Sequence, residues 1–255
     1  ALAAGCTAVV KLPEQNAQIN RLFTEIITQT EGLAPGVLNM LTADRHAAAA
    51  LIDSPDVPAI SFTGSTATGK AISAAGAAHL KRFGLELGGK TPFILFESAD
   101  LTQALPVVEK ALTTFAGQFC MTGSRLLVHR SLADQVRDQL AQRLRAVKPG
   151  PAADPTSDMG PLIDRANVTR VDTLVEKAIA AGARPIVRGG PVTDGPLADG
   201  AFYRPTLLEV TDPTLDIVQE EVFGPVLTLQ VFDTETEAVT LANDSVYGLA
   251  ASVWS

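Results

Sequence analysis

The sequence has 255 residues, of which 46% are hydrophobic and 19% charged, so it can bury a core and form one large domain or two of ordinary size. Its 20 Lys and Arg against 28 Asp and Glu give a net charge of −8, which argues against nucleic acid or an anionic membrane surface as the main partner. No apolar run approaches the ~20 residues of a membrane-spanning helix, and we expect no membrane partner.

The cysteines indicate a cellular compartment, and the two ends of the sequence indicate whether it is part of a longer protein. Cys6 and Cys120 could in principle pair, but two cysteines make a poor disulfide framework for this length, so we expect a reducing, cytoplasmic compartment. The sequence starts without an initiator methionine or a basic signal region, and its ends look like the end of a helix and the middle of a strand. We therefore expect an internal piece of a longer protein.

The first third of the sequence alternates strand and helix patterns. Short β-branched or apolar runs predict strands over residues 7–11, 36–41 and 57–62. Asn16 is a candidate cap for the first helix. That helix is indicated by apolar residues at helical spacing, namely Ile19, Leu22, Phe23, Ile26 and Ile27. Further helices are predicted over 43–53 and 66–78. Such alternation predicts a parallel sheet with helices on both faces.

A strand that starts near Lys81 leads into Gly88-Gly89, the best candidate boundary between a domain of residues 1–87 and a domain of residues 88–255. Beyond it, strands are predicted over 92–96, 125–129, 203–210, 226–232 and 250–254. Helices are predicted after a cap at Asp100, over 132–147 and 164–182, and between the last two strands. Stretches rich in Gly and Pro at 148–158 and 189–200 are typical of loops.

Residues 64–70, Gly-Ser-Thr-Ala-Thr-Gly-Lys, follow a predicted strand and open a helix. Backbone N–H groups at such a helix start can bind a diphosphate. The spacing nearly matches the G-x-x-x-x-G-K of a P-loop, but Ala71 stands where that motif needs a Ser or Thr hydroxyl for Mg²⁺. A nucleoside triphosphatase is therefore disfavoured. From these residues alone, a turn that binds no ligand stays open beside a diphosphate site.

Acyl-enzyme chemistry requires at least a thiolate that attacks a carbonyl carbon and a carboxylate that activates water. Cys120 and Glu86 could supply these two groups. Cys120 lies between a predicted helix and a strand, with small residues nearby that allow close approach. Glu86 lies between Leu85 and Leu87, an apolar setting that suits a general base. Taken alone, Cys120 also fits a buried inert thiol, and Glu86 a surface side chain on an edge strand.

Five stretches, spread over the whole sequence, resemble the aldehyde dehydrogenase superfamily. They are Lys11-x-x-Glu14, Phe-Thr-Gly-Ser-Thr at 62–66 followed by Gly69, Leu-Glu-Leu-Gly-Gly-Lys at 85–90, Gly-Gln-Phe-Cys at 117–120 leading to Ser-Arg at 124–125, and Glu-Glu-Val-Phe-Gly-Pro-Val at 220–226. The resemblance implies an α/β fold. A Rossmann-like parallel-sheet coenzyme domain in residues 1–87 would precede an α/β catalytic domain in residues 88–255, both incomplete.

The resemblance implies oxidation of an aldehyde to a carboxylic acid. Cys120 would attack the aldehyde, hydride would pass to NAD and leave a thioester, and Glu86 would activate the water that hydrolyses it. Cys6 has no such motif around it and is expected to be a buried thiol. The three histidines are scattered and show no ligand spacing, so no metal is expected.

The resemblance also implies where NAD would bind. Gly64 and Ser65 would lie by the diphosphate, Glu221 by the nicotinamide ribose and Phe223 by the nicotinamide. Lys11 and Glu14 come just past a strand, where members of the family hold the adenine ribose, although from these residues alone a solvated pair of loop residues stays open. An ionised Glu14 would accept bonds from both adenine ribose hydroxyls and repel a 2′-phosphate, which favours NAD over NADP. The implied cofactor-binding residues are Lys11, Glu14, Gly64, Ser65, Gly69, Leu87, Glu221 and Phe223.

Two parts of the family pattern are absent from the sequence. An asparagine that donates to the oxyanion would precede residue 1, and a Phe-Gly-Gly-x-Lys motif and an oligomerisation strand would follow Ser255. The backbone amide of Cys120 remains as an oxyanion donor, and loss of one such donor typically costs ~10²–10³-fold in rate. We expect the full-length protein to be an active homodimer or homotetramer, and the isolated chain to be weak or inactive.

A catalytically silent homologue with a structural or binding role is the main alternative, although such a protein has no need of both Cys120 and Glu86. Within the enzymes, members that transfer the acyl group to coenzyme A generally lack the glutamate, so its presence favours hydrolysis. Phe119 and Met121 are bulky, apolar neighbours of the nucleophile. They favour an apolar or aromatic aldehyde over a small charged one.

Overall fold

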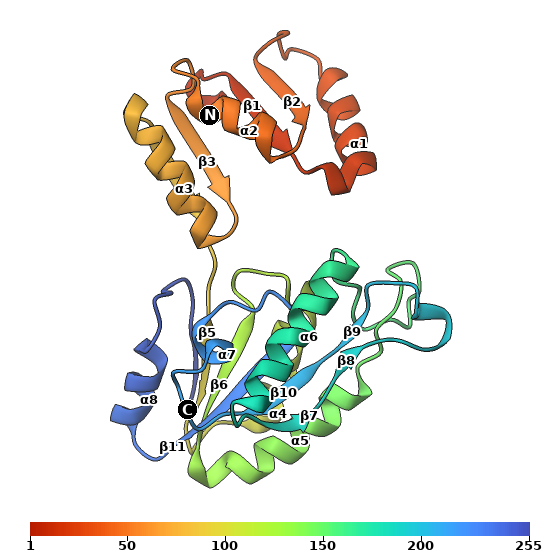
Figure 1. Cartoon of the computed structure of the whole chain (residues 1–255), viewed down its shortest axis with the longest axis vertical. Coiled ribbons are helices and arrows are strands. Elements are labelled where there is room, and N and C mark those ends of the chain that lie inside the picture. The colour runs from red at the N-terminus through yellow and green to blue at the C-terminus, as the bar shows by residue number, and fades with distance from the viewer. The chain divides into compact units, whose positions relative to one another are not determined.

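The computed structural model describes residues 1–255 without a gap. The chain divides into two compact units, an N-terminal unit of Ala1–Leu87 and a C-terminal unit of Gly88–Ser255. Within each unit strands and helices alternate, as the ribbon in Figure 1 shows. Parallel strands need crossover connections of this kind, and helices usually supply them.

The N-terminal unit contains four strands and three α-helices. Its strands are β1 (Ala8–Leu12), β2 (Leu38–Thr42), β3 (Ala59–Thr63) and β4 (Arg82–Glu86). Its helices are α1 (Ala17–Thr28), α2 (Arg45–Asp53) and α3 (Thr66–Gly76). β1 pairs with β2 and β3 pairs with β4, in both cases in parallel, as two separate ladders rather than one continuous sheet.

Two helices of this unit start at side chains that accept hydrogen bonds from otherwise unpaired N–H groups. Asp44 accepts from two backbone N–H groups, and α2 starts directly after it. Ser65 accepts from Thr68 N–H at the start of α3. Asn16 stands at the N-cap position of α1 as predicted, but its side chain makes no such bond.

The N-terminal unit buries few apolar side chains. Ile72 of α3 is its one buried hydrophobic residue. The apolar face by which α1 was predicted lies on the surface, with Ile19 66% and Ile26 62% exposed. The helical spacing therefore predicted the helix correctly, but the unit has no core of its own that covers this face.

The C-terminal unit contains eight strands and five α-helices. Its strands are β5 (Thr91–Leu95), β6 (Gly123–His129), β7 (Arg184–Val187), β8 (Gly190–Pro191), β9 (Tyr203–Arg204), β10 (Thr206–Glu209), β11 (Val226–Phe232) and β12 (Ser252–Trp254). Its helices are α4 (Leu101–Thr113), α5 (Ala133–Ala146), α6 (Arg165–Ala180), α7 (Asp216–Gln219) and α8 (Glu235–Asn243). Six strands form one sheet in the order β12-β5-β6-β11-β10-β7, parallel except for the edge strand β7.

Helices cover both faces of this sheet (Figure 1). Because successive side chains of a strand point to opposite faces, Leu126 and Val128 of β6 pack in one core with α4 and α5, while Leu127 packs in another with α8. Leu207 and Leu208 of β10 divide in the same way, and Leu208 faces the core that contains α6. The predicted α/β fold class is confirmed. A sheet with helices on both faces, which the alternation predicted for the first third of the chain, is found in this unit, whereas the N-terminal unit has two separate parallel ladders.

Three details differ from the prediction. β7 and α7 were not predicted, because each has four residues and Pro185 weakens the strand pattern of β7. The strand predicted over 203–210 divides into β9 and β10 at Pro205, which has no N–H for a ladder. The loop predicted over 189–200 contains β8, which pairs with β9.

Candidate active site

The candidate residues of the N-terminal unit gather where β3 and β4 end. Thr63 lies opposite Glu86 in the parallel register, and Gly64 N–H donates to the Glu86 carbonyl oxygen at 3.0 Å. Ser65 follows directly and starts α3. Gly64, Ser65 and Glu86 therefore lie at the carboxyl end of the β3–β4 ladder, the edge at which open α/β sheets bind ligands.

The start of α3 keeps unpaired donors. Ser65 Oγ accepts from Thr68 N–H at 3.2 Å, whereas the N–H groups of Thr66 and Ala67 have no hydrogen-bond partner in the chain. Gly64 and Ser65 are exposed. Accessible N–H groups at the positive end of a helix suit an anionic group such as a diphosphate.

Gly69 and Leu87 contact each other. Gly69 is buried in the first turns of α3, and a Cβ added there would lie 2.7 Å from Leu87 Cδ2. Glycine at this position lets α3 approach the chain just beyond β4 closely. The helix α3 thus packs against Leu87, which is half-buried.

Two expectations about the remaining N-terminal candidates need correction. Lys11 does not follow a strand but lies within β1, half-buried, while Glu14 is exposed in the short 3₁₀ turn after it. The apolar setting expected for Glu86 is not found. Glu86 is exposed, because Leu85 and Leu87 flank it in sequence but alternate residues of a strand face opposite ways.

Cys120 lies in a tight turn between α4 and β6. Phe115, Ala116 and Gly117 before it all adopt left-handed backbone conformations, with φ of 50°, 55° and 72°, and so turn the chain sharply after the helix. Cys120 is partly exposed, and its backbone N–H has no hydrogen-bond partner in the chain. Cys6 is exposed, so the prediction that it is a buried thiol is wrong.

Gln118 fixes this turn at its base. Its Nε2 donates to the carbonyl oxygens of Phe115 at 2.9 Å and Pro161 at 3.2 Å. Its Oε1 accepts from Ile163 N–H at 2.9 Å. An amide side chain with three bonds joins the turn to a segment more than 40 residues away in sequence. Cys120, two residues further on, is therefore carried by a turn that is held in place.

The loop that carries Glu221 and Phe223, residues 220–225 between α7 and β11, packs against the Cys120 turn. A Cβ added at Gly117 would lie 2.3 Å from the carbonyl oxygen of Gly224, so the two backbones are in contact. A cavity of about 10 Å³ lies between the two loops and is lined from both. That is the space of about one water molecule. The structure thus brings Glu221 and Phe223 next to the turn of Cys120.

Glu221 is half-buried, and burial raises the pKa of its carboxyl group. Gly89 N–H, which donates to Oε1 at 3.4 Å, acts in the opposite direction, as do the positive charges of Lys90 and Arg170. The carboxylate also touches the backbone, because a Cβ at Gly88 would lie 2.2 Å from its Oε2. The two glycines of the Leu-Glu-Leu-Gly-Gly-Lys stretch are thus the surface against which Glu221 rests.

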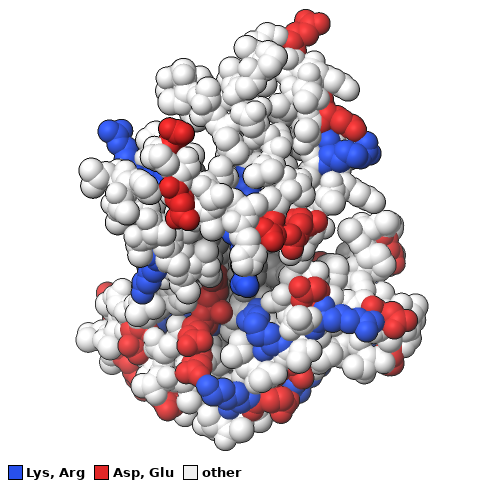
Figure 2. Space-filling model, turned by 45° about the horizontal axis from the view of Figure 1, so that its top comes forward, with Lys and Arg blue, Asp and Glu red and all other residues white.

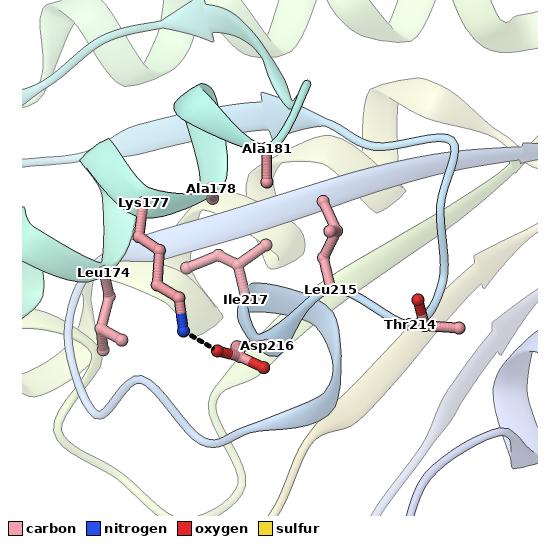
Figure 3. Close-up of a pocket in the computed structure, with 8 residues that line it drawn as sticks. All are labelled: Leu174, Lys177, Ala178, Ala181, Thr214, Leu215, Asp216 and Ile217. Carbon is pink, nitrogen blue, oxygen red and sulfur yellow. Dashed lines mark hydrogen bonds and ion pairs between the residues drawn. The ribbon is translucent and has the colours of Figure 1, made fainter.

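A larger cavity lies away from all candidate residues. It has a volume of about 220 Å³ and lies between α6 and the segment 214–217, beside the ion pair of Lys177 and Asp216 (Figure 3). Its remaining lining residues are mostly apolar, namely Leu174, Ala178, Ala181, Thr214, Leu215 and Ile217. Neither Cys120 nor Glu86 lines it, so we do not assign the active site there.

No three His, Cys, Asp or Glu side chains converge so that they could hold a metal ion. None of the helices has the length and apolar character that crossing a membrane requires. Acidic and basic side chains are interspersed on the face shown in Figure 2.

Sequence reasoning missed three residues that shape this site, Gln118, Lys90 and Arg170. Gln118 and Lys90 stand inside the quoted stretches, so a motif position without an assigned role was the available signal. Arg170 lies on α6 outside any motif, and its contact with the 220–225 loop is visible only in the fold.

Comparisons with known proteins agree over the whole chain. The Aldehyde dehydrogenase family matches residues 1–255. Betaine aldehyde dehydrogenase of Bacillus subtilis (strain 168) is 40% identical over 256 residues, which cover 100% of this chain and 52% of the relative. A crystal structure of Mycobacterium tuberculosis aldehyde dehydrogenase complexed with NAD⁺ has a TM-score of 0.93 and 38% identity, with 100% of this chain and 52% of that chain covered.

Betaine aldehyde dehydrogenase from Staphylococcus aureus in complex with NAD⁺ has a TM-score of 0.92 and 37% identity, with 100% of this chain and 50% of that chain covered. The chain spans about half the length of these relatives. Because the family matches every residue, from the first strand to the last, this chain belongs to the aldehyde dehydrogenase family.

Proposed function

We propose that the full-length protein that carries this chain oxidises an aldehyde to a carboxylic acid, with NAD as the hydride acceptor. The observation that carries the proposal is the turn of Cys120, a partly exposed thiol beside its own unpaired backbone N–H, packed against the loop of Glu221 and Phe223. Family membership supports the proposal, as do the two relatives whose structures contain NAD⁺.

Residues of both units fit the parts of NAD, the N-terminal unit as coenzyme-binding domain and the C-terminal unit as catalytic domain. The unpaired N–H groups at the start of α3, next to Gly64 and Ser65, suit the diphosphate. The exposed Glu14, three residues after Lys11, would accept bonds from the adenine ribose. Glu221 would do so for the nicotinamide ribose. NAD, when bound, supplies the acceptor for hydride.

The chemistry assigned to the chain's own residues starts at Cys120. Its thiolate attacks the aldehyde carbon and forms a carbon–sulfur bond, and the carbonyl oxygen becomes an oxyanion to which Cys120 N–H donates. Loss of hydride from that carbon leaves a thioester. Glu86 takes a proton from water, whose oxygen attacks the thioester and releases the acid and the thiolate. In sum, aldehyde, NAD⁺ and water give acid, NADH and a proton.

We propose an apolar or aromatic aldehyde as the substrate. Phe115, Phe119 and Met121 are exposed close to Cys120 in sequence, and the rings of Phe115 and Phe119 meet edge to face with 6.2 Å between centroids. Such a surface gains free energy when an apolar substituent covers it. Aromatic faces also attract cations, so betaine aldehyde, from which two relatives take their names, belongs in the test panel.

The test is aldehyde-dependent NADH formation, followed by absorbance, for the complete protein and for this chain alone. The panel contains benzaldehyde, a straight-chain aldehyde and betaine aldehyde. We expect C120S to lose at least about 10³-fold in rate, because a hydroxyl without an activating base is a poor nucleophile. C6S is the matched control and should act like the wild type. NADH formation by C120S at the wild-type rate would rule out Cys120 as the nucleophile.

A silent homologue is separated from an enzyme by the reactivity of its thiols. The proposed function predicts that iodoacetamide modifies Cys120 faster than the exposed Cys6, and that bound NAD changes only the rate at Cys120. Equal rates at both cysteines, together with no NADH formation from any aldehyde in the panel, would favour the silent homologue.

A further inference from the structure

The loop that carries Glu221 is held by two cationic side chains, one on each side of the glutamate. Lys90 Nζ donates to the carbonyl oxygen of Glu220 at 2.5 Å. Arg170 Nη2 donates to the carbonyl oxygen of Val222 at 2.9 Å. The residues directly before and after Glu221 are therefore both fixed through their backbone.

The two donors come from separate parts of the C-terminal unit. Lys90 directly precedes β5, and Arg170 lies on α6. Arg170 is itself oriented by Asn167, whose Oδ1 accepts from its Nε at 3.1 Å. The loop is thus connected on one side to the central sheet and on the other to a helix.

Lys90 is only 2% exposed, which is unusual for a lysine. The charged groups that face it are Arg125 on β6 and the loop residues Glu220 and Glu221. Burial first, and then the positive charge of Arg125, lowers the pKa of Lys90 to about 7, against the opposing effect of the two glutamates. Arg125 donates to the carbonyl oxygen of Lys90 at 2.9 Å, so it also holds the backbone at this point.

We propose that Lys90 and Arg170 are positioning residues, which hold the Glu221 carboxylate ionised and in place for the nicotinamide ribose of NAD. The inference rests on the ribose role of Glu221 in the proposed function. A half-buried carboxylate accepts hydrogen bonds from ribose hydroxyls best when it is charged and already oriented. Two nearby cations that hold the flanking carbonyl groups provide both conditions.

The alternative is that the two side chains only stabilise the loop. Both roles predict some loss of stability when a donor is removed, so stability does not distinguish them. A positioning role in addition predicts that the effect on NAD binding passes through Glu221, and that it follows the charge of Lys90.

The experiment is calorimetric titration of NAD into the complete protein without aldehyde, so that its readout does not depend on turnover. We expect K90M and R170M each to weaken NAD binding about 10-fold, the size expected for a lost charged hydrogen bond. R170K, which can still donate to Val222, should restore most of the affinity. R145M is the matched control, because Arg145 donates to the Ile186 carbonyl oxygen in the same unit at 2.9 Å, away from the loop.

A double-mutant cycle tests whether the effect passes through Glu221. K90M should weaken NAD binding in the wild type but hardly at all in E221Q, where no carboxylate is left to hold. The affinity of the wild type should fall as pH rises from about 6 to about 8, because Lys90 then loses its charge, and K90M should show no such fall. Additive effects in the cycle, or wild-type affinity in both K90M and R170M, would overturn the inference.

Failure of the inference and failure of the proposed function give different results. If the wild type forms NADH but E221Q binds NAD normally, Glu221 has no ribose role and this inference falls while the function stands. If no aldehyde supports NADH formation, the function falls, and the NAD titrations still decide on Lys90 and Arg170. If K90M does not fold, R170M, R170K and their cycle with E221Q decide the outcome.

Discussion

The two units of the chain carry their candidate residues in contrasting ways. In the N-terminal unit, candidate residues lie at exposed strand ends and beside unpaired backbone N–H groups. Ile72 is the one buried hydrophobic residue of this unit. In the C-terminal unit Cys120 and Glu221 lie on loops whose backbones touch, above a sheet with large cores on both faces. The proposed diphosphate site therefore depends on local backbone geometry alone, whereas the proposed nucleophile lies on a turn that a large core supports.

Amide hydrogen exchange should show the largest contrast between the units. We expect amides of β6 to be protected at least about 10²-fold more than amides of β3, because protection follows the free energy of opening and β6 lies within buried cores. The measurement is exchange of this chain followed by mass spectrometry of peptides. Equal protection of the two strands would contradict the view that only the C-terminal unit has a supporting core.

Two glycine substitutions compare how tightly the loops of each unit are packed. G117A should lower the free energy of unfolding by about 2–4 kcal/mol, because φ is +72° and a Cβ would strike the Gly224 backbone. G36A in the N-terminal unit has a similar φ of +85° but open space around it, and should cost about 1 kcal/mol. Urea unfolding checks both values. Equal costs would mean that the close approach at Gly117 is not needed.

The buried Lys90 gives the C-terminal unit a pH dependence of its own. Its pKa of about 7 lies below the ordinary value of 10.5, so between these values the unfolded chain binds more protons and stability rises with pH. The slope from this residue is at most ~1.4 kcal/mol per pH unit. Urea unfolding followed by the fluorescence of Trp254 at pH 7 to 9.5 should show a smaller slope in K90M. An unchanged slope would show that Lys90 does not titrate in this range.

Helix caps in the N-terminal unit should give the smallest effects. S65A and D44A each remove a side chain that accepts from backbone N–H groups, and each should lower the stability of the fold slightly, as the loss of a helix cap does. S65A should also weaken NAD binding, because Ser65 lies at the proposed diphosphate site, whereas D44A should not. Thermal unfolding and NAD titration separate the two effects. Equal NAD affinities in the two variants would argue against a diphosphate at α3.

Local sequence patterns predicted most of the helices and strands. They could not predict the features of the site that depend on contacts between residues far apart in the sequence. The cap at Asp100 was predicted and its carboxylate accepts from Thr102 N–H, because both residues are close in sequence. β7 was missed because Pro185 hides a strand that depends on its neighbour β10. Glu86 stood in a recognisable stretch, but its exposure could not be read from its apolar neighbours.

The same limit applies to the residues around Glu221. The resemblance singled out Glu221 itself, whereas Lys90 lies 130 residues from its hydrogen-bond partner and Arg170 lies 52 residues from its own. Contacts between residues so far apart in the sequence form only when the sheet and α6 pack together. The motifs therefore singled out the candidate residues, and the fold was needed to see which side chains hold them.

Mass spectrometry of the acyl-enzyme tests the proposed roles of Cys120 and Glu86 together. The complete E86Q protein is mixed with NAD and an aldehyde that supports NADH formation in the wild type, quenched in acid, and digested. We expect an added acyl group on the peptide that contains Cys120, because without the Glu86 carboxylate water is not activated to release it, and no addition at Cys6. An adduct at Cys6, or no adduct while E86Q turns over at the wild-type rate, would contradict the roles assigned to Cys120 and Glu86.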